Sequence, residues 1–340
     1  MNIPAKKWTK QNSPKRILTI RLQAMGDLVI TLPYLQALRN ALPSSAKLDL
    51  LTLEENESIP RSIKLFDKIY SIRGYRNFKK QLAFTCLLLP GILLRYYDVV
   101  LDLQNNLISR IVRKAVMPHA WCEFDKFSSI AAGERTRLTI EAIGLGQNFP
   151  DSNFILKNEV NTRELLKKNG WDETSAIVIL NPAGAFETRN WSLKNYIDFA
   201  RLWLNIFPAT QFLVLGVNSI AAKADYFKSE LRDKLINLVN KTSPAQAFAI
   251  IQKVKFVLSE DSGLMHIAWV SGVPTLAMFG STHNRSRPLG NHTILLDSAD
   301  LECGNCMLEF CKYGDTHCLT RYTPEMVFEK AVTLLHSASL

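Results

Sequence analysis

The sequence RLQAMGDLVITLP, residues 21–33, follows an apolar run at residues 17–20 and leads into a helical pattern that starts at Asp27. In an open parallel α/β sheet, a side chain at the start of the helix after a strand looks into the ligand crevice. Asp27 is therefore a candidate functional carboxylate. The alternative is a helix cap, since aspartate is favoured at helix N-termini and its charge suits the helix dipole. This stretch alone does not separate the two.

The strand and helix patterns continue to alternate along the chain, which predicts parallel sheets flanked by helices in two Rossmann-like α/β domains. A length of 340 residues suits two cores better than one. We expect a first domain at 1–160, a second at 161–323, and a C-terminal helix at 324–340 that crosses back to the first domain. The predicted strands are residues 17–22, 48–53, 99–103, 176–180, 212–215, 256–259 and 275–279.

The formal net charge of +10 belongs to the first half of the chain. Residues 1–150 carry 22 Lys or Arg against 12 Asp or Glu, and the remainder carries 19 of each. This excess predicts an anionic partner, namely nucleic acid, a phosphorylated glycolipid or a membrane surface, with a merely solvated basic face as the alternative. The amino terminus lacks the apolar core of a signal peptide, and no run of eighteen uncharged apolar residues occurs, so we expect a cytoplasmic protein.

One segment of the first half combines apolar and basic residues. Residues 73–80 are strongly basic, residues 81–94 are almost wholly apolar around Pro90-Gly91, and Arg95-Tyr96-Tyr97 follows. Such a segment suits the headgroup region of a membrane but is too short to span it. A buried helix with a Pro-Gly break fits the pattern equally well.

Four of the six cysteines form the cluster Cys303-x2-Cys306-x4-Cys311-x6-Cys318. In a reducing compartment, this spacing favours a closed thiolate site for a structural zinc or iron over disulfides. Free or redox-labile thiols are the alternative.

Five further motifs follow residues 21–33 in order: DLQ at 102–104, NPAGA at 181–185, RNW at 189–191, EDSGLMH at 260–266 and GVPTLAMFGST at 272–282. Together they resemble glycosyltransferase family 9, the bacterial heptosyltransferases, from about residue 16 to about residue 328. The resemblance implies a GT-B architecture, in which two Rossmann-like domains with parallel sheets face a central cleft. It also implies an acceptor held mainly by the first domain and a nucleotide-sugar donor held mainly by the second.

In an inverting transfer, a base must take the proton of the acceptor hydroxyl as that oxygen attacks the anomeric carbon. Asp27 matches the family's catalytic aspartate and is our candidate for this base. The resemblance further places the acceptor-binding residues at Gly26, Asp102, Gln104 and Asn105.

The donor-binding residues implied by the resemblance are Ala183, Gly184, Arg189, Asp261, Ser262, Gly263, Leu264 and His266. Arg189 stands where the family usually has a lysine that pairs with the phosphates. Ser262, Gly263 and Leu264 open a helix whose backbone donors suit a phosphate. We expect Asp261 to bind sugar hydroxyls and His266 to orient the turn or touch the phosphate, with a buried core histidine as the alternative. Trp191 is expected to pack rather than to stack on a base.

No Asp-x-Asp triplet occurs, so we expect no catalytic metal. Some family members carry a similar cysteine-rich tail. The function expected from the resemblance is transfer of heptose, or a related sugar, from an ADP-sugar such as ADP-heptose to a phosphorylated lipopolysaccharide core acceptor at the cytoplasmic surface of the inner membrane, where the protein would be peripheral.

Three alternatives remain open at this point. In the first, the chain is a transferase of the same fold whose acceptor is a protein or whose donor is another nucleotide sugar. In the second, the chain is a degenerate transferase, which the presence of both Asp27 and Asp261 disfavours. In the third, it is a non-catalytic nucleic-acid-binding module, which the basic half allows. Because no recognisable nucleic-acid-binding motif accompanies the basic residues, we expect no nucleic-acid partner.

Overall fold

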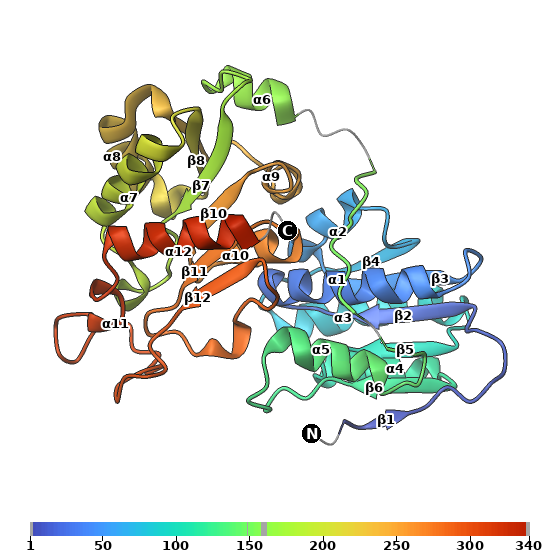
Figure 1. Ribbon diagram of the computed structural model, residues 1–340. Helices are drawn as coiled ribbons and strands as arrows, with labels where there is room; N and C mark the ends of the chain where they lie inside the picture. Colours follow the sequence, from blue (N-terminus) through green and yellow to red (C-terminus); the bar gives the residue numbers. More distant parts are fainter. Residues whose placement is uncertain (1–2, 148, 158–161, 338–340) are drawn as a thin grey trace. The chain divides into compact units, whose positions relative to one another are not determined.

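The computed structural model describes residues 3–147, 149–157 and 162–337. The chain divides into two compact units, Met1–Asn158 and Glu159–Leu340. Each unit consists of one six-stranded sheet with helices on both faces (Figure 1). The expected boundary at 160/161 and the end of the expected C-terminal helix, residues 338–340, lie outside the described residues.

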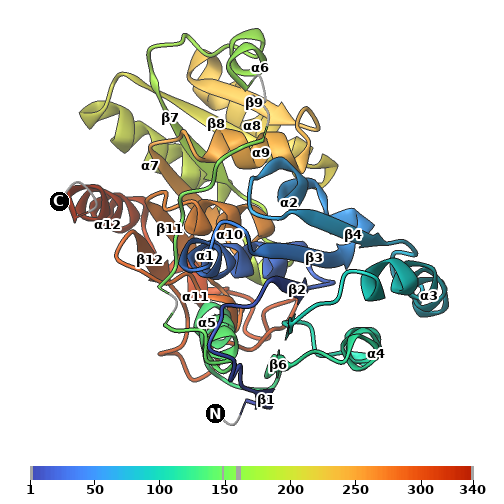
Figure 2. The same ribbon diagram turned by 90° about the vertical axis from the view of Figure 1, so that its right-hand side faces the viewer.

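The first unit has the strand order β1-β6-β5-β2-β3-β4, parallel throughout except for the antiparallel edge strand β1. Helices α1 and α5 pack together on one face, and α3 and α4 pack together on the other (Figure 2). The strands are β1 Ala5–Lys6, β2 Arg16–Ile20, β3 Lys47–Leu53, β4 Lys68–Ile72, β5 Val99–Asp102 and β6 Ala120–Glu123; the helices are α1 Met25–Ala41, α2 Ser58–Ser62, α3 Phe78–Leu93, α4 Leu107–Val116 and α5 Ala132–Glu141, with a 3₁₀ turn η1 at Glu54–Asn56.

The second unit repeats this plan with the fully parallel order β12-β11-β10-β7-β8-β9. Helix α12 packs on α7 within this unit. The strands are β7 Ala176–Asn181, β8 Thr210–Gly216, β9 Leu235–Val239, β10 Phe256–Glu260, β11 Thr275–Met278 and β12 Thr293–Leu296; the helices are α6 Thr162–Lys168, α7 Leu193–Ile206, α8 Ala221–Leu231, α9 Pro244–Ile251, α10 Gly263–Val270, α11 His317–Thr320 and α12 Pro324–Ser337, with 3₁₀ turns η2 Glu187–Arg189, η3 Asn218–Ile220, η4 Arg232–Lys234 and η5 Asn284–Ser286.

Both sheets are doubly wound: successive strands are first added on one side of the first central strand and then on its other side. The change of side lies between β2 and β5 in the first unit and between β7 and β10 in the second. Ligands of open α/β sheets bind outside the carboxyl ends of the strands at this point. The prediction of two Rossmann-like units is confirmed, and each of the seven predicted strands corresponds to an observed one.

One local expectation and one of the two alternatives for residues 81–94 were wrong. Helix α1 begins at Met25, two residues before the predicted start at Asp27. The apolar segment at 81–94 is not a buried helix broken at Pro90: α3 continues through Pro90, and only Gln81, Thr85 and Ile92 of its residues are buried. No helix among the described residues has the length and apolar character needed to cross a bilayer.

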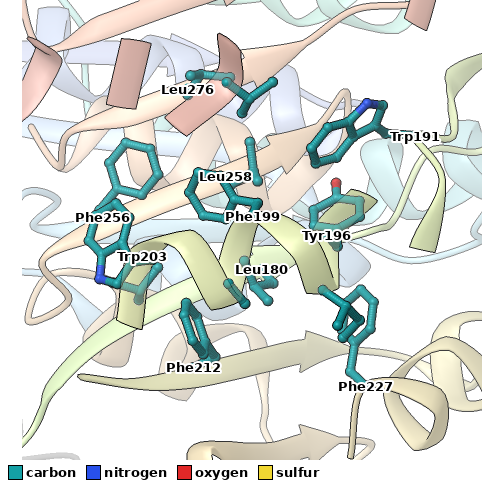
Figure 3. Packing of buried hydrophobic residues seen from close by; sticks show 14 of the residues in the cluster. Leu180, Trp191, Tyr196, Phe199, Trp203, Phe212, Phe227, Phe256, Leu258 and Leu276 are labelled. Atoms are coloured by element: carbon teal, nitrogen blue, oxygen red, sulfur yellow. The ribbon is translucent and has the colours of Figure 1, made fainter. Parts of the chain in front are cut away.

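The second unit is held together by an aromatic core. Trp191 is buried in it, as expected, and its ring centroid lies 5.1 Å from that of Tyr196. Trp203 stacks on Phe256 at 5.1 Å (Figure 3). Large aromatic rings contribute much of the apolar area that a core buries, so these contacts fix α7 against the sheet. The loop that ends at Trp191 is therefore held at its C-terminal end by the core of the second unit.

Candidate functional site

Asp27 lies at the strand-end crevice of the first unit, in the first turn of α1. One carboxylate oxygen accepts the backbone N–H of Ala24 at 3.2 Å, which is a capping contact. The other lies 3.1 Å from Nη2 of Arg21, and 41% of the Asp27 side chain stays exposed. Asp27 therefore stabilises the start of its helix and still presents a carboxylate to solvent, so the two functions considered for it are compatible.

The other candidate residues of this unit support the loop before Asp27. The side-chain oxygen of Gln104 accepts the backbone N–H groups of Leu22 and Gln23 at 2.9 and 3.0 Å. Gly26 lies beside Asp27 in the first turn of α1. The structure thus brings Gly26, Asp27 and Gln104 together at the ends of β2 and β5.

Asp102 has no exposed surface, and it shapes the turn after β5. Its carboxylate accepts the backbone N–H of Asn105 at 2.7 Å and the hydroxyl of Ser109 at 3.0 Å. Burial raises the pKa of Asp102, and these hydrogen bonds, with the charge of Arg113, oppose the shift. The side chain of Asn105 donates to the carbonyl of Phe124 at 2.9 Å. In this structure the side chains of Asp102 and Asn105 hold the turn after β5 in place. Their predicted contact with an acceptor stays a prediction.

In the second unit, the turn after β7 is built around the buried carboxylate of Glu260. This carboxylate accepts the N–H groups of Gly184 and Trp191, both at 2.7 Å. A Cβ on Gly184 would lie 2.4 Å from the carbonyl oxygen of Arg189, so only glycine fits here. Burial raises the pKa of Glu260 to about 7, although the two N–H donors favour its charged form. Glu260 therefore fixes the loop that carries Ala183, Gly184 and Arg189.

Arg189 ends η2 and is directed at the end of β10. Its Nη1 lies 3.2 Å from a carboxylate oxygen of Asp261, and its guanidinium lies over the ring of Phe186 at 4.5 Å. The same oxygen of Asp261 accepts the hydroxyl of Thr282 at 2.9 Å. The predicted phosphate-binding cation and the predicted sugar-binding carboxylate thus form one ion pair, and Thr282, in the loop after β11, holds the carboxylate of that pair.

Helix α10 opens beside this pair. Ser262 caps it by accepting the N–H of Met265 at 3.3 Å, and Asn181 at the end of β7 donates to Ser262 at 2.7 Å. The first N–H groups of a helix have no acceptor within it, so those of Gly263 and Leu264 are suited to bind an anion. A Cβ at Gly263 would meet no atom within 4 Å, which leaves open space in front of the helix. His266 is buried, with its ring 6.2 Å from that of Trp269.

The four clustered cysteines line one cavity of about 370 Å³ next to η2. Burial raises the pKa of Cys318 to about 11, and the charges of the other three cysteines add to the shift. Yet the described residues include no group of three or more Cys, His, Asp or Glu side chains placed to hold a metal ion. The observed thiol arrangement gives no support to a zinc or iron site; the site stays a prediction, to be checked by metal analysis of the purified protein.

Two residues of the second site were given no role from the sequence: Asn181 and Glu260. Each lies inside a stretch that resembles the family, and each ends a strand or follows one. Their position at a strand end could have marked them. Their partners could not be predicted, because Glu260 accepts hydrogen bonds from backbone N–H groups that come close to it only when the loop is folded.

Comparison with known proteins identifies the family of this chain. The model of "Glycosyltransferase family 9 (heptosyltransferase)" matches residues 129–317, more than half of the chain. The chain belongs to glycosyltransferase family 9. Its relatives include "Lipooligosaccharide heptosyltransferase 2" of Campylobacter jejuni subsp. jejuni serotype O:2, which is 29% identical over 182 residues, 52% of this chain and 55% of that protein. The chain thus spans about half the length of the first curated relatives it matches.

Solved structures agree on the fold of this family 9 chain. A family 9 glycosyltransferase from Veillonella parvula superposes with a TM-score of 0.77 at 18% identity and covers 95% of this chain and 97% of its own. E. coli heptosyltransferase WaaC, crystallised with ADP-2-deoxy-2-fluoro heptose, gives 0.67 at 17% identity, covering 94% and 99%. The predicted family and the predicted GT-B class of fold are confirmed.

Proposed function

We propose that this family 9 chain is an inverting glycosyltransferase that moves heptose, or a related sugar, from an ADP-sugar to a lipopolysaccharide core acceptor. The observation that carries the proposal is the exposed carboxylate of Asp27 at the strand-end crevice of the first unit. The heptosyltransferase name of the Campylobacter relative and the ADP-sugar analogue bound to WaaC support the choice of sugar and nucleotide.

In this proposal, Asp27 is the general base. Its exposed carboxylate takes the proton of the acceptor hydroxyl while that oxygen forms a bond to the anomeric carbon of the donor. The bond from this carbon to the diphosphate breaks, and its electron pair leaves with ADP. Arg21 and the N–H of Ala24 hold the carboxylate in place, so its orientation is set before the acceptor arrives.

The second unit stabilises the charge that grows on the diphosphate. Arg189 supplies a cation, and the first turn of α10 supplies backbone N–H groups at the edge of the open space before Gly263. Because Arg189 is paired with Asp261 before the donor binds, the diphosphate has to share the guanidinium with that carboxylate. The arginine fork allows this, since it has donors for two acceptors.

We further propose that the transfer needs no catalytic divalent cation, since the sequence lacks an Asp-x-Asp triplet. The proposed acceptor is a phosphorylated glycolipid, whose lipid part lies in a membrane. The proposed location is therefore the cytoplasmic surface of the inner membrane.

The test is a transfer assay with purified protein, ADP-heptose and a lipopolysaccharide core that lacks the heptose. ADP release and a gain of one heptose in the mass of the acceptor are expected, without added magnesium. Asp27→Asn should lower turnover by about 10²–10⁴-fold and leave ADP binding nearly intact. The control is Asp225→Asn, an exposed aspartate on α8. Equal turnover of the Asp27 variant and wild type would remove Asp27 from the mechanism.

A further inference from the structure

The outward face of α3 and of the residues beside it is apolar although it is exposed. Leu87, Leu94 and Tyr96 have exposed fractions of 74%, 73% and 83%. We define the α3 surface as the exposed apolar residues of this region together with its neighbouring cations: Phe78, Leu87, Leu93, Leu94 and Tyr96, with Arg76, Lys79 and Lys80.

The inward face of α3 is more polar than expected. Gln81 and Thr85 are buried there, and the Thr85 hydroxyl donates to the carbonyl of Gln81 at 2.7 Å. Phe84 and Leu88 are only partly buried against the core of the unit. A helix at a soluble surface normally buries its apolar side chains and exposes its polar ones. In α3 much of the apolar surface is left outside, so the core of the unit does not account for it.

The charged residues of α3 itself have one sign, while Glu54 and Glu55 lie near its N-terminal end, beside Arg76 and Lys80. The helix contains no Asp or Glu, and Lys79 and Lys80 lie in its first turn, where the helix dipole disfavours cations. The neighbouring Arg73 is paired with Glu54 at 3.1 Å. By contrast, in the part of the chain that the structure describes, Arg76, Lys79 and Lys80 form no ion pair. Their position does not serve the helix, and they remain available for an external anion.

We propose that the α3 surface binds an anionic lipid bilayer, with Leu87 and Leu94 inserted among the acyl chains and Arg76, Lys79 and Lys80 at the lipid phosphates. At 16 residues, α3 is about 24 Å long and lies in the interface plane, as amphipathic interfacial helices do. The inference deepens the proposed function, because a glycolipid acceptor lies in a bilayer, but it is measured without any turnover.

Charge complementarity favours a bilayer over a protein partner as the occupant. An interfacial helix combines apolar side chains with cations that attract anionic headgroups, and the α3 surface has both. The cores of protein interfaces are instead depleted of lysine, which this surface carries twice in a row.

The experiment is flotation of the full chain with vesicles of phosphatidylcholine alone or mixed with phosphatidylglycerol. Binding to the mixed vesicles, weakened by salt, is expected. The double variant Lys79→Gln/Lys80→Gln should lower the partition coefficient about 30-fold, since each cation near an anionic surface contributes about fivefold. Leu87→Ser/Leu94→Ser should lower it at least about tenfold.

Matched controls come from the second unit, where exposed residues of the same kinds occur. These are Lys168→Gln/Lys330→Gln for charge and Ile206→Ser/Val217→Ser for apolar exposure. All four double variants should keep the thermal stability of wild type within a few degrees, because the replaced side chains are exposed. Only the two variants of the α3 surface should lose vesicle binding.

An exposed thiol on α3 provides a second readout in the unaltered protein. Cys86 and Cys306 are both exposed, and only Cys86 lies on α3. Anionic vesicles should slow the alkylation of Cys86, followed by peptide mass spectrometry, and leave that of Cys306 unchanged.

Lack of binding to anionic vesicles, or equal binding by the variants of the α3 surface and by their controls, would overturn the proposal and leave a protein partner as the occupant. Failure of the proposed function is distinguishable: vesicle binding would persist while ADP-heptose is not consumed. Conversely, transfer to a delipidated core oligosaccharide should not change in the variants of the α3 surface.

Discussion

Nη2 of Arg21 lies 3.1 Å from Oδ1 of Asp27, and the two side chains differ sharply in exposure, at 7% and 41%. The guanidinium also donates to the carbonyl of Leu103 and lies 5.0 Å from the ring centroid of Phe124. Burial lowers the pKa of Arg21, and Asp27 opposes that shift. The buried cation therefore connects the candidate base to the end of β5.

Arg21→Lys should lower turnover by about tenfold or more with little change in ADP affinity. A lysine keeps the charge but lacks the fork that reaches Leu103 and Asp27 together, so the carboxylate loses its fixed orientation. The measurement is kcat beside the Kd for ADP from calorimetry. Arg201→Lys, at an exposed ion pair in the second unit, is the control. An unchanged kcat would show that Asp27 is oriented without Arg21.

Arg189→Ala should weaken ADP binding by about 10–100-fold, because a charge-assisted contact with the diphosphate is lost. Arg189→Lys should recover part of the affinity, since the charge returns without the fork. Calorimetry with ADP checks both, with Arg201→Ala as the control. Equal affinities in all variants would place the diphosphate away from η2.

Two glycines of the donor site should respond in opposite ways to alanine. Gly184→Ala should lower the melting temperature, since its Cβ would lie 2.4 Å from the Arg189 carbonyl oxygen and 2.9 Å from Glu260. Gly263→Ala should not, because its Cβ meets no atom and alanine favours a helix. If a diphosphate approaches Gly263, this second variant should nevertheless weaken ADP binding. Wild-type ADP affinity in Gly263→Ala would argue against that approach.

Glu260 should make stability depend on pH. Its folded pKa of about 7 exceeds the usual value of 4.5, so its contribution to stability is complete below about pH 4.5 and is lost as pH rises through about 7. The loss is on the order of 3 kcal/mol. Glu260→Gln cannot ionise and offers one acceptor to two N–H donors, so it should be less stable than wild type at pH 5 by about 1–3 kcal/mol.

Urea unfolding at pH 5 and pH 8 measures this effect, with Glu329→Gln, an exposed residue of α12, as the control. The gap between wild type and Glu260→Gln should narrow at pH 8. A gap that stays the same at both pH values would mean that Glu260 is ionised in the folded protein throughout this range.

The sequence was most informative where a strand is buried on both sides. Residues 48–53 and 256–259 are apolar except for Asp49, Thr52 and Ser259, and both lie in interior strands. The strands that were not predicted lie toward the sheet edges or are short. Edge strand β4 reads Lys-Ile-Tyr-Ser-Ile, and β6 has four residues, two of them only partly buried. Short or half-exposed strands leave too few apolar residues for a periodic signal.

The candidate site was predictable in its residue types and less so in its contacts. Asp27 and Asp261 were identified from short motifs, yet no motif indicates that Asp261 is paired with Arg189 or that Glu260 holds the N–H of Gly184. These contacts join residues more than seventy positions apart, and they arise only once β7 and β10 lie side by side. A side chain's partner is a property of the assembled sheet.

The cysteine-rich loop at 299–316 contains no strand. It is held in place by hydrogen bonds to the turn that carries Arg189 and to the segment after β11. Thr188 donates its hydroxyl to the carbonyl of Leu308, 120 positions away, and Met307 donates its N–H to the carbonyl of Ser281 at 2.9 Å. A protease cut within this loop would leave both sheets whole and would loosen the turn beneath Arg189. Protein cut in this loop should therefore still unfold cooperatively but bind nucleotide more weakly. Stability and nucleotide affinity, which are usually lost together, would then be lost separately.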